Sequence, residues 1–291
     1  MTERGAGYPG ALRLLWETVT GRRPVERSGP LLQAFIDMPA PLRGAVRWVL
    51  RPKRRFLFGR LRELSGDRVM SGPFAGMQLR GYPAAPELLG SYEHELFDVV
   101  RQLAQRGFHT VVNVGARYGY YAIGLARLMP TATVRAFEGD AEARGMMADA
   151  VRANGVEARV QVGGFCDTAE LIEALGSGDG VLLVCDIDGG EVPLLDPVAV
   201  PALTRATMLV ECHGPPETPT EAVMVMRFLP THDVKRVATE ERVLAHLPEG
   251  VAEPWRSRMP RVMEELMQEH RTPPQSWLVM MPRGGHQPSD V

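Results

Sequence analysis

From residue 109 onward, short apolar runs alternate with segments whose apolar residues recur every three or four positions. The short runs predict β-strands, and the longer spacing predicts amphipathic α-helices between them. This alternation is typical of a parallel sheet built from right-handed βαβ units. The expected strands are 109–115, 133–139, 158–164, 180–188, 206–214 and 276–282, the last of which would close the sheet, and the expected helices are 119–129, 141–155, 168–176 and 221–229.

The remaining patterns divide the chain into three parts. Residues 1–68 carry short amphipathic pieces at 11–19, 31–38 and 42–64, which predict a helical arm that forms a lid or a dimer contact. Residues 69–283 form the predicted main domain, with a hairpin over 69–82, a helix over 87–107, and a helix over 261–271 that packs Met263, Leu266 and Met267 into a core. Residues 284–291 are expected to be a flexible tail.

The charge pattern adds an asymmetry to this division. The net charge of −2 hides an arm with 14 basic and 6 acidic residues in positions 1–68. No apolar run approaches the roughly 18 residues of a membrane span, and the acid-containing start lacks the apolar segment of a secretory signal. We therefore expect a cytoplasmic protein without a membrane span. The three cysteines have no C-x-x-C spacing, so they are expected to be reduced and partly buried.

The glycine turn after the first strand of the series, in the stretch VVNVGARYGYYAIGLA, indicates a ligand site. Ligands of open parallel sheets bind beyond the carboxyl ends of the strands, where the strand order reverses. The dinucleotide fingerprint G-x-G-x-x-G fails here, because Arg117 and Tyr120 stand where its second and third glycines would be. A P-loop motif is also absent from the sequence. The turn therefore disfavours NAD, FAD and nucleoside triphosphates.

Two later strand ends favour a cofactor that has a ribose and an adenine but no pyrophosphate. Glu138 ends the second strand 23 positions after Gly115, where a carboxylate can accept hydrogen bonds from ribose hydroxyls. Phe165, after the third strand, can pack on an adenine face, and Asp167 can reach the adenine amino group. The order of these elements favours S-adenosylmethionine.

The same residues resemble a known family. N-V-G-A-R-Y-G-Y-Y, AFEGD, CDIDGGEVPLLDP and LVECHG are similar to motifs of class I S-adenosylmethionine-dependent methyltransferases of the FkbM type, and GSYEHEL resembles a segment ahead of their glycine turn. The resemblance covers about residues 72–282. It implies a Rossmann-like class I methyltransferase fold, with a mostly parallel seven-stranded sheet and helices on both faces. It also implies that the cofactor is bound by Glu93, Asn113, Gly115, Ala116, Tyr120, Glu138, Gly139, Gly164, Phe165 and Asp186.

Two positions depart from the family pattern. Asn113 replaces an acidic residue near the cofactor's cationic end, and Asp188 replaces a glutamate. The chemistry is expected where the next two strands end, because alternation puts Asp186 with Asp188 and Glu211 with His213 on one side of their strands. We expect His213 to be the general base, Glu211 to orient His213 or the substrate, and Asp186 to lie by the amino acid part of the cofactor.

The predicted function is O-methylation of a hydroxyl or carboxyl on a small molecule. The segment CDIDGGE at the end of the fourth strand contains no aromatic residue that could stack on a flipped base, so nucleic acid is disfavoured as a substrate. Three alternatives stay open: attack at the aminobutyrate carbon with release of methylthioadenosine, a non-catalytic scaffold whose basic arm binds nucleic acid or protein, and His213 as a loop cap. A divalent metal is a further alternative to a metal-free site, with oxygen and nitrogen ligands from Asp186, Asp188, Glu191, Glu211, His213 and His232.

Overall fold

The computed structural model describes residues 57–213, 220–247, 249, 251, 256–257, 260–269 and 275–284. The chain divides into two compact units. One unit comprises residues 1–66 and 241–269, and the other comprises residues 67–240 and 270–291. The predicted arm pieces at 11–19 and 31–38, most of 42–64 and nearly all of the predicted tail lie outside the described residues. The three-part division of the chain therefore stays a prediction.

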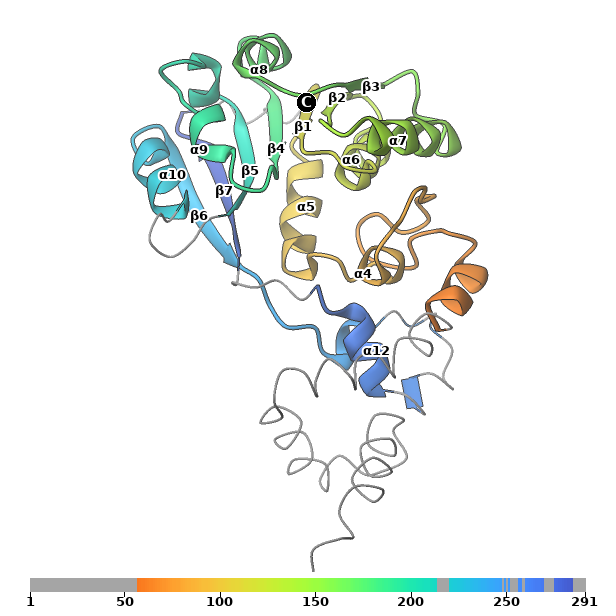
Figure 1. Cartoon of the computed structure of the whole chain (residues 1–291). Coiled ribbons are helices and arrows are strands. Elements are labelled where there is room, and N and C mark those ends of the chain that lie inside the picture. Colours follow the sequence, from red (N-terminus) through yellow and green to blue (C-terminus); the bar gives the residue numbers. More distant parts are fainter. Residues whose placement is uncertain are drawn as a thin grey trace, which may run out of the picture. The chain divides into compact units, whose positions relative to one another are not determined.

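The larger unit contains one seven-stranded sheet in the order β3-β2-β1-β4-β5-β7-β6 (Figure 1). The strands β1 to β5 pair in parallel, and β7 runs antiparallel to its two neighbours β5 and β6. In the centre of the sheet, Thr110 of β1 lies opposite Thr133 of β2 and Val181 of β4. The strands are β1 Thr110–Val114, β2 Thr133–Phe137, β3 Val160–Gly163, β4 Val181–Cys185, β5 Thr207–Cys212, β6 His232–Ala238 and β7 Ser276–Pro282. The expected Rossmann-like, mostly parallel α/β fold is confirmed.

Helices cover both faces of this sheet. One face of the sheet packs against α8 and α10 through a buried cluster that includes Leu171, Met224 and Phe228. Helices α6 and α7 contact the opposite face (Figure 1). The central strands β4 and β5 are buried along their whole length, as expected of strands covered on both sides. These helices are α6 Tyr120–Leu128, α7 Ala141–Ala153, α8 Thr168–Leu175, η3 Pro201–Thr204, α9 Glu191–Leu194 and α10 Thr220–Phe228.

The segment ahead of the sheet differs from its prediction. Residues 69–82 form turns closed by hydrogen bonds such as Val69 N to Met77 O, with one isolated bridge between Arg68 and Gln78 in place of a hairpin. The single helix predicted over 87–107 is broken at Gly90, whose φ of +75° is the left-handed conformation that ends a helix. Three shorter pieces take its place: α4 Ala85–Leu89, η2 His94–Leu96 and α5 Phe97–Ala104.

Two further outcomes concern the end of the chain. The strand at 276–282 was expected to close the sheet, but β7 inserts between β5 and β6, and the sequence pattern missed the edge strand β6. In the smaller unit, η4 spans Leu244–His246 and α12 spans Pro260–Met267. Met263, Leu266 and Met267 are buried on α12, as predicted. The three cysteines are free and buried. Among the described helices, none is long and apolar enough to cross a membrane.

Candidate functional site

The glycine turn predicted to hold a cofactor joins β1 to α6 at the point where the strand order reverses. The chain leaves β1 toward β2 and β3 on one side and returns through β4 on the other. Gly115 has a φ of +80°, and a Cβ at this position would lie 1.6 Å from the carbonyl oxygen of Asp186. Only glycine therefore lets the end of β1 approach the end of β4 this closely.

Four backbone N–H groups of this turn are already used within the protein. Gly115 and Ala116 both donate to the carbonyl oxygen of Phe137, at 3.0 and 2.9 Å, and Gly119 donates to Ala116 at 2.7 Å. Arg117 N donates to the carboxylate of Glu138 at 2.7 Å. A pyrophosphate site needs such N–H groups free to face the ligand. These four groups are therefore not free to bind a pyrophosphate.

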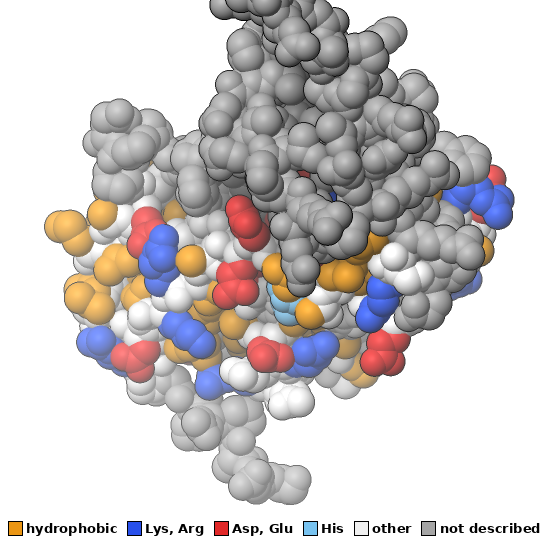
Figure 2. All heavy atoms as spheres, turned by 90° about the horizontal axis from the view of Figure 1, so that it is seen from below, with side chains coloured by type: hydrophobic (Ala, Val, Ile, Leu, Met, Phe, Trp, Pro, Cys, Tyr) orange, Lys and Arg blue, Asp and Glu red, His pale blue; other side chains and the backbone are white. Residues whose placement is uncertain are grey.

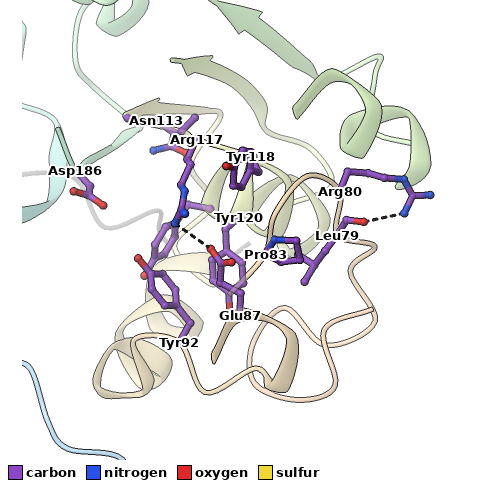
Figure 3. A pocket seen from close by; sticks show the side chains of 13 residues that line it. Leu79, Arg80, Pro83, Glu87, Tyr92, Asn113, Arg117, Tyr118, Tyr120 and Asp186 are labelled. Carbon is purple, nitrogen blue, oxygen red and sulfur yellow. Dashed lines mark hydrogen bonds and ion pairs between the residues drawn. The ribbon is translucent and has the colours of Figure 1, made fainter. Parts of the chain in front are cut away.

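A pocket opens at the carboxyl ends of β1 and β4 (Figure 3). Five predicted cofactor residues line it, and the segment between residues 79 and 92 supplies the facing wall. The predicted members are Asn113, Gly115, Ala116, Tyr120 and Asp186, and the members that sequence reasoning missed are Leu79, Arg80, Pro83, Glu87, Tyr92, Arg117, Tyr118 and Tyr121. The quoted GSYEHEL and RYGYY motifs contained several of the missed residues, but no spacing rule showed that they face one another.

Asn113 is a buried polar residue among those that line this pocket. Its side chain is 2% exposed, and its amide nitrogen donates weakly to the Val184 carbonyl oxygen at 3.4 Å. Its Oδ1 atom is buried and has no hydrogen-bond partner among the described residues. A buried acceptor without a partner is destabilising unless a ligand supplies a donor. Oδ1 of Asn113 is therefore a buried acceptor that the described residues leave unused.

Arg117 links the two walls of the pocket. It has a φ of +47°, stacks over the Tyr118 ring at 4.9 Å, and lies 3.8 Å from the carboxylate of Glu87, as the dashed line in Figure 3 shows. Burial raises the pKa of Glu87, and the Ala84 N–H and the Arg117 charge offset part of that rise. The pair thus joins the glycine turn to α4 at the side of the pocket.

Four of the other predicted cofactor residues, Glu138, Gly139, Gly164 and Phe165, follow the ends of β2 and β3. The carboxylate of Glu138 accepts from Arg117 N and, at 2.8 Å, from Asp140 N, so two backbone N–H groups fix its orientation. Phe165 is 77% exposed and faces Gly139, where an added Cβ would lie 3.7 Å from its ring. Gly164 has open space beside it. This edge is therefore open to a flat ligand.

Two expected cofactor contacts have other partners in the structure. Asp167, predicted to reach an adenine amino group, caps α8 by accepting from Glu170 N at 2.9 Å. Glu93 is 1% exposed and accepts a hydrogen bond from the Tyr121 hydroxyl, and it is not among the residues that line the pocket. Burial and this glutamate raise the pKa of Tyr121.

A cluster of titratable groups lies where β4 and β5 end. Strand alternation does not place it, because Asp186 and Asp188 follow the end of β4 and Asp188 has a φ of +52°. His213 Nε2 lies 3.3 Å from Glu211 Oε2 and 3.6 Å from one carboxylate oxygen each of Asp186 and Asp188. The side chains of Glu211 and His213 are 2% and 10% exposed, while that of Asp188 is 98% exposed. Asp186 belongs to both the pocket and this cluster, so the two features adjoin.

Glu191 makes the shortest contact with the imidazole, at 2.9 Å from Nδ1. The same carboxylate oxygen accepts from the backbone N–H groups of Ile187 and Gly189, at 3.4 and 3.2 Å. Glu191 thus holds both His213 and the turn that carries the two aspartates, whereas Glu211 was the residue expected to orient His213 or the substrate. No pattern indicated this, because Glu191 begins the short helix α9 instead of ending a strand.

The charges of the cluster shift two pKa values in opposite directions. Burial alone would lower the pKa of His213, but its hydrogen bond to Glu191 and the nearby carboxylates raise it above its usual value. Burial alone would raise the pKa of Glu191, but the hydrogen bonds from His213 and from backbone N–H groups lower it. Nδ1 therefore carries a proton that it donates to Glu191.

His232 does not belong to this cluster, contrary to its inclusion in the metal alternative. It begins the edge strand β6, and its ring contacts the Ala206 carbonyl oxygen at 3.0 Å and the Thr231 hydroxyl at 2.8 Å. Burial lowers its pKa; the Ala206 carbonyl and Asp233 partly oppose this effect, and Arg283 adds to it. His232 is therefore a buried neutral residue of the fold.

Comparisons with known proteins found similar structures but no similar sequences. No family model matches the chain, and no curated protein sequence matches it. Among solved structures, the METTL16 MTase domain aligns with 76% of this chain and 79% of its own, at 13% identity and a TM-score of 0.47. The O-methyltransferase from Bacillus cereus in complex with SAH covers 63% of this chain and 80% of its own, at 11% identity and a TM-score of 0.42.

Two more structures have similar values. The O-methyltransferase TomG from Streptomyces achromogenes, in complex with SAM, covers 70% of this chain and 92% of its own, at 14% identity and a TM-score of 0.41. For a Pyrococcus horikoshii protein, the match spans 62% of that protein's length, at 13% identity and a TM-score of 0.39. At such identities and scores, the likeness says nothing about the substrate or the reaction of this chain.

Proposed function

We propose that this chain is an S-adenosylmethionine-dependent methyltransferase that acts on a hydroxyl group of a small molecule. The observation that carries the proposal is the pocket at the reversal point of the sheet, whose lining includes Asn113 with its buried, unpartnered Oδ1. Ligands of open α/β sheets bind at this point. The paired N–H groups of the glycine turn disfavour a diphosphate there.

The residues present fit this cofactor. Asn113 would accept a hydrogen bond from its amino group, Glu138 would accept from its ribose hydroxyls, and Phe165 would pack on its adenine. When bound, S-adenosylmethionine supplies a methyl group on a sulfonium, so that an acceptor O–H is converted to O–CH₃ with release of S-adenosylhomocysteine and a proton. The fixed orientation of the Glu138 carboxylate means that little ordering is needed on binding.

The cluster at the ends of β4 and β5 would hold the acceptor. Asp186 lies in both the pocket and the cluster, so an acceptor beside His213 would also lie beside the cofactor site. The carboxylates and the imidazole can take the proton that a hydroxyl loses. An acceptor that is itself a carboxylate would be repelled by four carboxylates, which favours the hydroxyl over the carboxyl among the acceptors expected from the sequence.

The described part of one face supports a small acceptor over a nucleic acid. Acidic and basic side chains alternate with hydrophobic ones over the described part of the face in Figure 2. A groove that follows a phosphate backbone shows a continuous basic stripe instead. The described side chains in this view form no such stripe, although the basic segment 1–56 lies outside the described residues.

Calorimetric titration with S-adenosylmethionine, S-adenosylhomocysteine and NAD tests the proposal. We expect micromolar binding of the two adenosyl ligands and none of NAD. Glu138→Ala should weaken adenosyl binding about tenfold or more, the effect of losing hydrogen bonds to a charged group. The matched control is Glu157→Ala, which removes an exposed glutamate from the turn before β3 and should leave binding unchanged.

Analysis of the products then identifies the reaction. Release of S-adenosylhomocysteine supports methyl transfer, while release of methylthioadenosine would show attack at the aminobutyrate carbon. Absence of heat with either adenosyl ligand would refute the proposal and favour a non-catalytic scaffold.

A further inference from the structure

The ring of His213 is arranged as a metal ligand. Its Nδ1–H donates to Glu191, a residue that is completely buried, so in the neutral ring the lone pair is on Nε2. That lone pair faces carboxylate oxygens of three other residues and, among the described residues, makes no hydrogen bond. An unpartnered ring nitrogen on a side chain that is 10% exposed, aimed at anionic oxygens, needs either a proton or a metal ion between them.

The distances from Nε2 to the facing oxygens fit such a cation. They are 3.3 Å to Glu211 Oε2 and 3.6 Å to Asp186 Oδ1 and Asp188 Oδ1. Metal–nitrogen and metal–oxygen bonds of about 2.1 Å put neighbouring ligand atoms about 3.0–3.4 Å apart, for octahedral and tetrahedral geometry respectively. Ligand atoms of Asp186, Glu211 and His213 all lie within 4.8 Å of one another. Small side-chain adjustments would therefore complete the coordination.

We propose that Asp186, Glu211 and His213 bind a divalent first-row transition metal ion. Asp188, which is 98% exposed, supplies a fourth ligand, and Glu191 is a positioning residue that orients the imidazole from the second shell. One imidazole with several carboxylates suits Mn²⁺, Fe²⁺ or Zn²⁺ better than Ca²⁺, which prefers oxygen ligands alone.

Metal binding can be tested separately from the proposed function. Among the proposed ligands, Asp186 alone also lines the cofactor pocket. The position of the metal site nevertheless has a consequence for that function. An ion held beside the pocket would bind and orient an acceptor oxygen there. The metal would then occupy the Nε2 lone pair, and a group other than His213 would take the acceptor's proton.

Titration of the chelator-treated full chain with Mn²⁺, followed by electron paramagnetic resonance, tests the site without any turnover. We expect a single Mn²⁺ per chain, seen as loss of the free-ion signal. His213→Ala should abolish this binding, and Glu191→Gln should weaken it about tenfold to a hundredfold, the usual effect of losing an outer-shell partner. Mg²⁺ should compete only weakly, because the imidazole favours the softer ion.

Two further variants keep the test valid if a buried substitution unfolds the chain. Asp188→Asn changes an exposed side chain and should weaken Mn²⁺ binding with an unchanged melting temperature. The matched controls, His109→Ala and Asp179→Asn, change an exposed imidazole and an exposed carboxylate ahead of β1 and β4, and they should leave Mn²⁺ binding unchanged. Failure of the wild-type chain to bind Mn²⁺, or equal binding by wild type and His213→Ala, would overturn the proposal. Adenosyl binding measured in the same samples would report on the proposed function separately.

Discussion

Replacing Asn113 by leucine should have opposite effects on stability and on ligand binding. In the free chain, Asn113 keeps a buried Oδ1 without a partner and gains only a 3.4 Å hydrogen bond to Val184 O. An unsatisfied buried polar group costs about 1–3 kcal/mol, and leucine removes that group at similar size. We expect Asn113→Leu to raise the free energy of unfolding by about 1 kcal/mol, or the melting temperature by about 2–4 °C.

Binding should change in the other direction. If Oδ1 accepts from the cofactor's charged amino group, its loss removes a hydrogen bond of about 1.5–3 kcal/mol and weakens S-adenosylhomocysteine binding about tenfold to a hundredfold. The companion variant Asn113→Asp keeps an acceptor, so it should retain binding while it destabilises the free chain by burying a charge. Calorimetry and thermal denaturation of the two variants give both values. A parallel fall of stability and affinity in Asn113→Leu would refute this reasoning, because it would make the residue structural.

Two more predictions concern the sheet. Gly115→Ala should lower the free energy of unfolding by at least about 2 kcal/mol in denaturant titration, because its φ is +80° and the new Cβ would meet the Asp186 carbonyl oxygen at 1.6 Å. The control Gly145→Ala lies in α7 with open space around it, and it should raise the free energy of unfolding by about 0.5–1 kcal/mol. Because burial lowers the pKa of His232, the unfolded chain binds a proton that the native chain does not, so the free energy of unfolding should fall as the pH drops below about 6.5, by at most about 1.4 kcal/mol per pH unit. Denaturation of His232→Asn across this range should show a smaller pH slope, and an equal slope would contradict the assignment.

The central strands could be predicted because they are short, apolar and buried on both faces. In β4 and β5 every residue is buried. Asp186 follows β4 directly and Glu211 lies near the end of β5, so both could be placed at the same end of the sheet. The edge strand β6 could not be found this way. Its sequence HDVKRVA mixes charged and apolar residues because one edge faces solvent, so only His232 is fully buried.

The parts of the site that sequence could not give depend on chain reversals. Glu191 reaches His213 because the turn after Asp186 folds back, and no periodicity encodes that approach. The pocket wall opposite the glycine turn likewise depends on Gly90, which breaks a helix that the apolar spacing favoured. Local patterns describe elements, whereas these contacts depend on how glycine turns redirect the chain between elements.

The charge balance of the cluster makes acceptor choice depend on the proposed metal. Carboxylates of Asp186, Asp188, Glu191 and Glu211 surround one imidazole, that of His213, so the cluster is negative in either protonation state of the ring. Without a metal it should repel anionic acceptors, and a divalent ion would cancel two of its negative charges.

A set of matched hydroxylated aromatic compounds, bearing a carboxylate, no charge or an amine, can measure this effect. In the chelator-treated chain, saturation-transfer NMR should show binding of the neutral and amine compounds in preference to the carboxylate compound. Addition of Mn²⁺ should increase binding of the carboxylate compound most, because its charge is the one that the ion complements. Preference for the carboxylate compound in the chelator-treated chain would contradict an acceptor site beside these four carboxylates, since no arrangement of the cluster makes it positive without a bound cation.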